Sequence, residues 1–193
     1  MNVIRETMLA LFFAGWLIFI ALRVGMNTSE HLINTQYTVI NQENLQTLTD
    51  IIEYDIRKIG HGLINPFTAI TLADSNRFIF SYDKDPSKNY DSIRVEYSLV
   101  RAVTTPNVHD KILYRKLNSH NTTKISLGIS RFKLKYYNRF GKELPTPVVS
   151  DSLSKIREIE ISLTIESRDL KENKYGNSKY VTRIVPKNLL IQY

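Results

Sequence analysis

Apolar residues fill the chain from position 7 to position 22, where sixteen consecutive residues carry no charge (TMLALFFAGWLIFIAL). As an α-helix this stretch would be about 24 Å long, against roughly 30 Å for the hydrocarbon core of a bilayer. Val3 and Ile4 lengthen it at one end and residues 24–26 at the other, and Arg23 can extend its guanidinium to the headgroups. The pattern predicts that residues 1–26 form a helix able to cross a membrane.

Three explanations compete for this apolar segment. A cleaved signal peptide needs a basic leader and a small-residue cleavage site, but Arg5 is followed by Glu6, and ALRVGMNTS contains no A-x-A. A buried core helix would need complete burial, because the stretch is apolar on every face. A retained membrane anchor needs only lipid around it, and this is the explanation that the sequence favours.

Residues 30–59 change to a one-sided pattern with helical spacing. Apolar side chains recur every three to five positions, at Ile33, Tyr37, Ile40, Leu45, Leu48, Ile52, Ile56 and Ile59. The other face is polar, with Asn34, Gln42, Glu43, Gln46, Asp50 and Glu53. Arg57 and Lys58, followed by Gly60, mark the end. We therefore expect one helix of about 55 residues, whose part over residues 27–62 packs its apolar stripe against a domain.

Beyond Asn65 the apolar positions alternate with a period of two, which is typical of half-buried strands. The expected strands cover residues 77–82, 91–102, 111–117, 124–129, 131–137, 155–165 and 179–191, with a turn at 138–141 and a polar tract at 167–178 before the last strand. Pro186 predicts an edge or a break in that last strand. The sequence thus predicts an α+β fold, in which residues 63–193 form an antiparallel β-sheet domain covered by the amphipathic half of the long helix.

Charge is unevenly divided along the chain. Residues 1–62 hold four Lys and Arg against six Asp and Glu, a net charge of −2, whereas residues 63–193 hold 22 against 13, a net charge of +9. The basic C-terminal part would suit an anionic partner such as nucleic acid, a lipid surface or an acidic neighbour, although many soluble domains carry such a charge without one.

No catalytic or cofactor motif stands out. The chain has no Cys, its four His residues lie far apart, and it contains neither a glycine-rich phosphate loop nor a G-x-S-x-G elbow. Asp83, Asp85, Asn89 and Asp91 form a loose Ca²⁺-like loop, but its lysines and missing Gly depart from the EF-hand pattern, which favours a solvated turn. We expect no enzymatic activity, no cofactor and no metal.

The segment FKLKYYNRF (132–140) interleaves aromatic and basic residues. Such a segment could stack on single-stranded nucleic acid. A half-buried strand with its aromatic side chains inward gives the same pattern, and this second interpretation is favoured.

The predicted architecture resembles the type IV pilin-like superfamily, which comprises pilins, minor pilins and the pseudopilins of type II secretion. The shared features are an apolar N-terminal helix with an acid at its mouth (Glu6), an amphipathic extension and a C-terminal sheet. The helix end, Asp55-Ile56-Arg57 with Gly60, is similar to the minor-pilin W and pseudopilin J families. Residues 129–144 and 153–165, and the ending Pro186-Lys187-Asn188-Leu189, resemble the same families.

This resemblance implies a structural subunit of a pilus-like or type II secretion filament, inserted in the inner membrane with the basic domain outside the cytoplasm, that primes or caps assembly. Glu6 would neutralise the N-terminal amine of a neighbouring subunit. Taken by itself, an acid at this place favours a simpler interpretation, a carboxylate at headgroup level that pairs locally with Arg5. Family members normally carry a leader that ends in Gly, and none precedes residue 2; with Met1 removed, Glu6 lies four residues beyond Asn2, the family's spacing. The alternative is a single-pass membrane protein whose basic β-domain binds an anionic ligand such as DNA.

Overall fold

The computed structural model of the protein describes residues 2–84, 92–102, 105–118, 121–171 and 174–190. The chain divides into two compact units, Met1–Ile40 and Asn41–Tyr193. One helix, α1 (Asn2–Arg57), supplies the described part of the first unit and continues into the second. The expected helix of about 55 residues is confirmed, including its end at Arg57.

A glycine ends the helical region, and its backbone N–H forms a hydrogen bond to the sheet. Gly60 has a φ of +73°, and its N–H donates to the carbonyl of Ser81 at 3.1 Å. A Cβ built at this position would lie 2.9 Å from Cβ of Pro66, so a side chain would collide with the short 3₁₀ helix η1 (Pro66–Thr68). The sequence Gly60 to Pro66 therefore turns the chain sharply from the helix toward the sheet.

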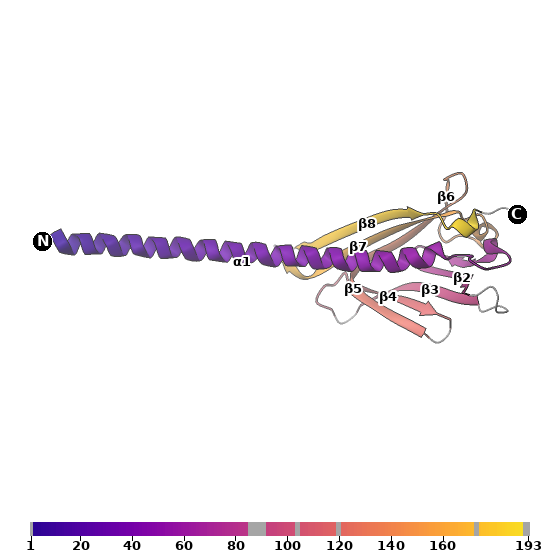
Figure 1. The fold of residues 1–193 in the computed structure, drawn as a ribbon, viewed down its shortest axis with the longest axis horizontal. Helices are drawn as coiled ribbons and strands as arrows, with labels where there is room; N and C mark the ends of the chain where they lie inside the picture. Colours follow the sequence, from indigo (N-terminus) through magenta and orange to yellow (C-terminus); the bar gives the residue numbers. More distant parts are fainter. Residues whose placement is uncertain (1, 85–91, 103–104, 119–120, 172–173, 191–193) are drawn as a thin grey trace. The chain divides into compact units, whose positions relative to one another are not determined.

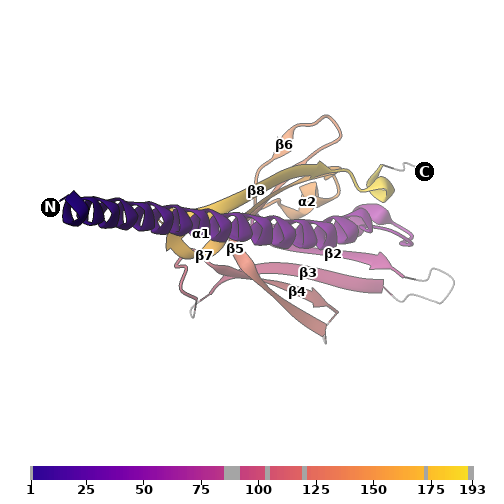
Figure 2. The ribbon, with the colours of Figure 1, turned by 60° about the vertical axis from the view of Figure 1, so that its left-hand side comes forward.

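The second unit is built on one antiparallel sheet whose strands follow the order β1-β2-β3-β4-β5-β7-β8, with β6 paired to β5. The sheet curls beside the second half of α1 (Figures 1 and 2), and the α+β class is confirmed. Its elements are β1 (Ile70–Ala73), β2 (Arg77–Asp83), β3 (Ser92–Arg101), β4 (Lys111–Leu117), β5 (Asn121–Tyr137), β6 (Glu143–Leu144), the short helix α2 (Ser150–Leu153), β7 (Glu158–Lys171), β8 (Lys174–Ile184) and the 3₁₀ helix η2 (Lys187–Leu189).

Several strand predictions were wrong in their extent, and one of them is the last strand, which was expected at 179–191 and is β8 (Lys174–Ile184). The strands expected at 124–129 and 131–137 are one strand, β5, which contains a register shift against β7 between Ile129 and Arg131. The expected polar tract at 167–178 is strand as well, because β7 and β8 form a long hairpin in which Glu166 pairs with Asn177. Polar side chains are tolerated on both faces there, since the hairpin extends beyond the packed core. β8 ends at Ile184 at the edge of the sheet, as Pro186 predicted.

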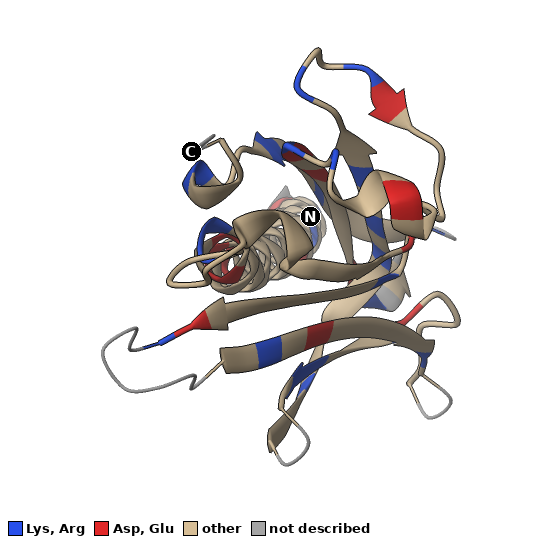
Figure 3. Ribbon diagram, turned by 90° about the vertical axis from the view of Figure 1, so that its right-hand side faces the viewer, with Lys and Arg blue, Asp and Glu red and all other residues tan. Residues whose placement is uncertain are grey.

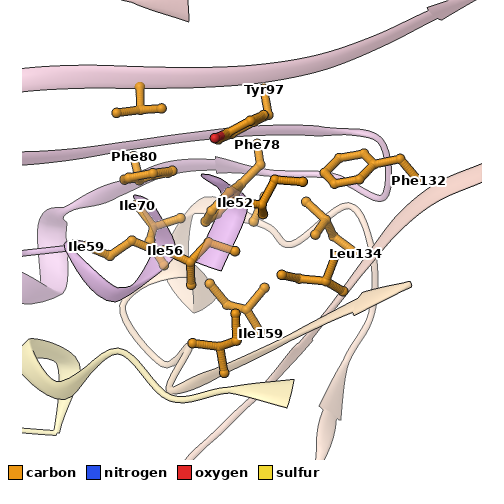
Figure 4. Packing of buried hydrophobic residues seen from close by; sticks show 14 of the residues in the cluster. Ile52, Ile56, Ile59, Ile70, Phe78, Phe80, Tyr97, Phe132, Leu134 and Ile159 are labelled. Atoms are coloured by element: carbon orange, nitrogen blue, oxygen red, sulfur yellow. The ribbon is translucent and has the colours of Figure 1, made fainter. Parts of the chain in front are cut away.

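The core of the second unit joins α1 to the sheet. Leu48, Ile52 and Ile56 from α1, with Ile59 just beyond it, are at most 1% exposed. Figure 4 shows Ile52, Ile56 and Ile59 among aromatic and aliphatic residues of the strands, including Phe78, Phe80, Tyr97, Leu134 and Ile159.

The N-terminal part of the predicted apolar stripe is not buried. Ile33, Tyr37 and Ile40 are 51%, 39% and 50% exposed, and their expected packing against the domain stays a prediction. These residues belong to the first unit, whereas the sheet unit begins at Asn41. Helical periodicity identified one face of the helix correctly, but it does not say where along the helix the cover begins.

We expect Ile52→Ala to lower the free energy of unfolding of the sheet unit by about 2–5 kcal/mol, because it leaves a cavity in a close-packed site. Ile33→Ala, the same change at an exposed position of the same helix, should alter it by less than about 0.5 kcal/mol. Urea unfolding of the full chain in detergent, followed by near-UV circular dichroism, measures both. Equal effects of the two variants would contradict the described burial.

Candidate functional site

The first unit presents an apolar surface that no residue of its described part covers. From Met8 to Leu22 the large apolar side chains are between 45% (Ile20) and 73% (Leu11) exposed. Among the described residues α1 is the one helix long and apolar enough to cross a membrane, and its most apolar window is 0% buried. This stretch is therefore not a buried core helix of the described structure.

This exposure has an energetic consequence. Residues 7–22 include nine Leu, Ile and Phe side chains. Placed in the centre of a bilayer, these residues together favour insertion by about 3–5 kcal/mol. An apolar helical surface of this kind requires lipid or other apolar helices around it.

Glu6 lies in α1 immediately before the apolar stretch, and its side chain is exposed. Within the described part of the chain it forms no ion pair with Arg5 or any other residue, so the local Arg5–Glu6 pair is not observed. Neighbouring Thr7 donates its hydroxyl to the carbonyls of Val3 and Ile4, at 3.1 and 2.9 Å, and so stays within its own helix. The Glu6 carboxylate is left available to a group outside the chain.

A buried ion pair fixes the other half of α1 to the sheet. Asp55 is 0% exposed and accepts two hydrogen bonds from Arg115 of β4, from Nε at 2.6 Å and from Nη2 at 2.9 Å. The hydroxyl of Tyr97 on β3 donates to the same carboxylate at 2.6 Å. Three charge-assisted bonds on one carboxylate compensate for the cost of burying it.

The three groups reinforce one another electrostatically. The hydrogen bonds to Asp55 raise the pKa of the Arg115 guanidinium, which is therefore charged at any working pH. Burial, and then the negative charge of Asp55, raise the pKa of Tyr97 well above its usual value, so its hydroxyl keeps the proton that it donates. The cluster is a structural clamp: each donor remains in the protonation state that the carboxylate needs.

Further polar contacts hold α1 and the residues after it against the C-terminal edge of the sheet. The Tyr180 hydroxyl of β8 donates to Glu53 at 2.7 Å, and Asn41 donates to the carbonyl of Gly176 at 3.4 Å. Asn188 donates to the carbonyl of Ile59 at 3.0 Å. The chain ending and the helix end, which lie far apart in sequence, are thus joined in space.

The other predicted sites have different outcomes. Of the loose Ca²⁺-like loop only Asp83 is described, as a buried residue at the end of β2, while Asp85, Asn89 and Asp91 lie outside the described residues. Within the described part of the chain no group of three His, Cys, Asp or Glu side chains could hold a metal ion.

In the segment 132–140 the strand interpretation is confirmed. Phe132, Leu134 and Tyr136 are buried, whereas Lys133 is exposed. Arg139 and Phe140, at the turn that follows, are exposed as well, so the inward packing of aromatic residues ends with the strand.

Sequence analysis missed the clamp. Asp55 was noted only as part of a helix-end motif, and Tyr97 lies within the strand expected at 91–102 without having been singled out. Arg115 carried no signal, because its partner lies sixty positions away in the chain. An acid on the otherwise apolar side of the helix, between Ile52 and Ile56, was the available hint.

No protein-family model matches this chain, and no curated protein is significantly similar to it.

We expect Arg115→Met to lower the free energy of unfolding by about 3–5 kcal/mol, because it leaves the Asp55 charge buried without its partner. Arg57→Met is the matched control, since Arg57 is 62% exposed and pairs with Glu53 on the helix surface. That change should cost no more than about 1 kcal/mol. The double variant, Asp55→Leu with Arg115→Met, should recover part of the lost stability, because it removes the unpaired buried charge. If urea unfolding shows that the losses of the two single variants simply add in the double variant, the clamp is contradicted.

Two arginines in the middle of the apolar segment should prevent stable membrane insertion. Each costs about 2.5–3.5 kcal/mol at the bilayer centre, which together exceeds the favourable contribution of the segment. We expect Phe13→Arg with Ile18→Arg to move the protein from the alkaline-extracted membrane pellet to the supernatant or to aggregates. Leu32→Arg with Ile33→Arg, beyond the segment, should leave it in the pellet. Retention of the first variant in the pellet would argue against a spanning segment.

Proposed function

We propose that this protein is a membrane-inserted structural subunit that assembles with other subunits through α1, as a minor pilin or pseudopilin of a type IV pilus-like or type II secretion filament. The observation that carries the proposal is the apolar, uncovered surface of α1 from Met8 to Leu22, preceded by the unpaired carboxylate of Glu6. The role is assembly, and no catalytic step is assigned to any residue.

The two halves of α1 suit two different surroundings. The first half is apolar on all sides, which fits both the interior of a bilayer and the centre of a bundle of like helices. The second half is amphipathic and holds the sheet unit through the buried row and the Asp55 clamp. A subunit of this kind can leave the membrane for a filament without losing its cover, because neighbouring apolar helices replace lipid.

Glu6 supplies a specific attraction in this scheme. A carboxylate at the edge of an apolar layer is unfavourable unless it stays at the interface or finds a positive partner. In an array of parallel helices the N-terminal amine of a neighbouring subunit has the right charge, and it reaches the depth of Glu6 when the two subunits are offset along the helix axis by about 6–7.5 Å. Pairing there would favour one axial offset between subunits, since a different offset would leave both charges without a partner.

The resemblance of the sequence to minor-pilin W and pseudopilin J families suggests a subunit that primes or caps assembly. It also suggests insertion in the inner membrane with the basic sheet unit on the extracytoplasmic side. Arg5 and Arg23 flank the apolar segment symmetrically, so the positive-inside rule gives no orientation of its own.

A second candidate function is binding of an anionic ligand such as DNA by a single-pass membrane protein. The net charge of +9 over residues 63–193 favours it. This function and assembly are compatible, because one uses the sheet unit and the other uses α1.

We expect Glu6→Ala to reduce incorporation into sheared filaments or secretion complexes at least about tenfold. A tenfold change corresponds to about 1.4 kcal/mol, which is the free energy that we expect the loss of one buried charge pair to cost. Glu43→Ala removes the same charge from an exposed position of the same helix and should incorporate like the unaltered protein. Immunoblots of the filament and membrane fractions measure both variants.

Equal membrane levels and an unchanged near-UV spectrum are the controls for folding. Normal incorporation of Glu6→Ala would sink the proposed role of this carboxylate. Equal loss for both variants would mean that net charge alone, and no specific pair, controls assembly.

A further inference from the structure

A pocket opens where η1, the β5–β6 turn and the start of β7 meet. Its volume is about 430 Å³, and it is lined by Phe67, Asn138, Arg139, Phe140, Ser154, Lys155 and Arg157. This volume is within the range of small-ligand sites. Three of the seven lining residues are basic, and none is acidic.

Some basic side chains elsewhere on the sheet unit pair with nearby acids. Arg77 pairs with Glu96 at 2.8 Å, Lys135 with Glu143 at 3.1 Å, and Arg183 with Glu160 at 3.2 Å. Figure 3 shows acidic and basic positions next to each other on several strands and basic positions on the hairpin that carries β6. In the described chain, by contrast, Arg139, Lys155 and Arg157 form no ion pair.

Two aromatic rings accompany these cations. The Arg157 guanidinium carbon lies 4.5 Å from the centre of the Phe67 ring, and that of Arg139 lies 4.6 Å from the centre of the Phe140 ring. Phe140 is 76% exposed, so most of its surface is open to a ligand. Rings that are bordered by guanidinium groups offer both a stacking surface and positive charge.

The walls of the pocket are held in place before any ligand arrives. Asn138 accepts hydrogen bonds through Oδ1 from the backbone N–H of Phe140 and of Lys142, at 2.9 and 3.1 Å, which fixes the turn. Arg157 donates from Nη1 to the carbonyl of Ser154 at 2.6 Å, and its backbone N–H donates to Tyr137 at 2.8 Å. The turn backbone and the Arg157 side chain are therefore ordered before a ligand binds.

Electrostatics favour an anion here. Burial, followed by the nearby charge of Arg139, lowers the pKa of Arg157, which is the direction expected for cations held together without an acid. A negative group placed between them would relieve that repulsion.

We propose that this pocket binds a nucleotide unit of single-stranded nucleic acid, with the base stacked on Phe140 and a phosphate held by Arg139, Lys155 and Arg157. A stacked base uses the open face of the ring, and the phosphate supplies the missing counter-charge. The inference is independent of the assembly role, because it uses residues of the sheet unit alone. It rests on the second candidate function, binding of an anionic ligand by this unit, and adds the site and the class of ligand to it.

The test is binding of a labelled single-stranded oligonucleotide of about 12 bases to the full chain in detergent, followed by fluorescence anisotropy over a range of salt concentrations. We expect Phe140→Ala to weaken binding roughly tenfold. Arg139→Gln with Lys155→Gln should weaken it and should reduce the slope of log K against log salt by about 1.4, as expected for two lost phosphate contacts.

The matched control is Lys124→Gln with Lys179→Gln, which removes the same charge from exposed positions of β5 and β8 outside the pocket. It should leave the affinity nearly unchanged, and duplex DNA or poly-glutamate should compete poorly. Equal weakening by both double variants, no effect of Phe140→Ala, equally tight binding of duplex or poly-glutamate, or absence of binding at low salt would each overturn the proposal.

Discussion

The Asp55 carboxylate is completely buried, and the position of α1 on the sheet depends on its two partners. An ionised carboxylate in a protein core is tolerated only where hydrogen bonds and an opposite charge surround it. Arg115 and Tyr97 provide both, from adjacent strands β4 and β3. A shift of the helix by one residue would rotate Asp55 by about 100° away from them. The clamp therefore selects which face of α1 enters the core, and the row formed by Leu48, Ile52 and Ile56 follows from that choice.

The same helix has no such constraint in its first unit. From Met8 to Leu22 it is apolar on all sides, and nothing in the described chain covers it. A helix that is amphipathic in one half and uniformly apolar in the other separates two tasks along one continuous element. One half holds a folded sheet unit, and the other half is left to associate with lipid or with other helices. This division of labour is the physical basis of the proposed assembly function.

Periodicity in the sequence was sufficient to predict the helix, its end at Arg57 and most strands. These elements depend on local spacing and on glycine and proline signals. It was insufficient for the hairpin of β7 and β8, whose polar residues are paired strand positions beyond the packed core. It was also insufficient for β1 and β6, which are only four and two residues long. Among candidate sites, Glu6 was proposed from its place before an apolar run, and its role stays a prediction. The clamp and the pocket could not be predicted, since each joins residues that are distant in sequence and adjacent only after folding.

The most direct test of the account uses the absence of cysteine from these 193 residues. Single cysteines placed at Trp16 in the apolar segment and at exposed Ser150 in the sheet unit report their surroundings through a membrane-impermeant maleimide. In cells with a permeabilised outer envelope and an intact inner membrane, we expect Ser150→Cys to be labelled rapidly and Trp16→Cys to stay unlabelled until detergent denatures the protein. Rapid labelling of Trp16→Cys, or labelling of Ser150→Cys only after lysis of the inner membrane, would contradict a spanning α1 with an external sheet unit.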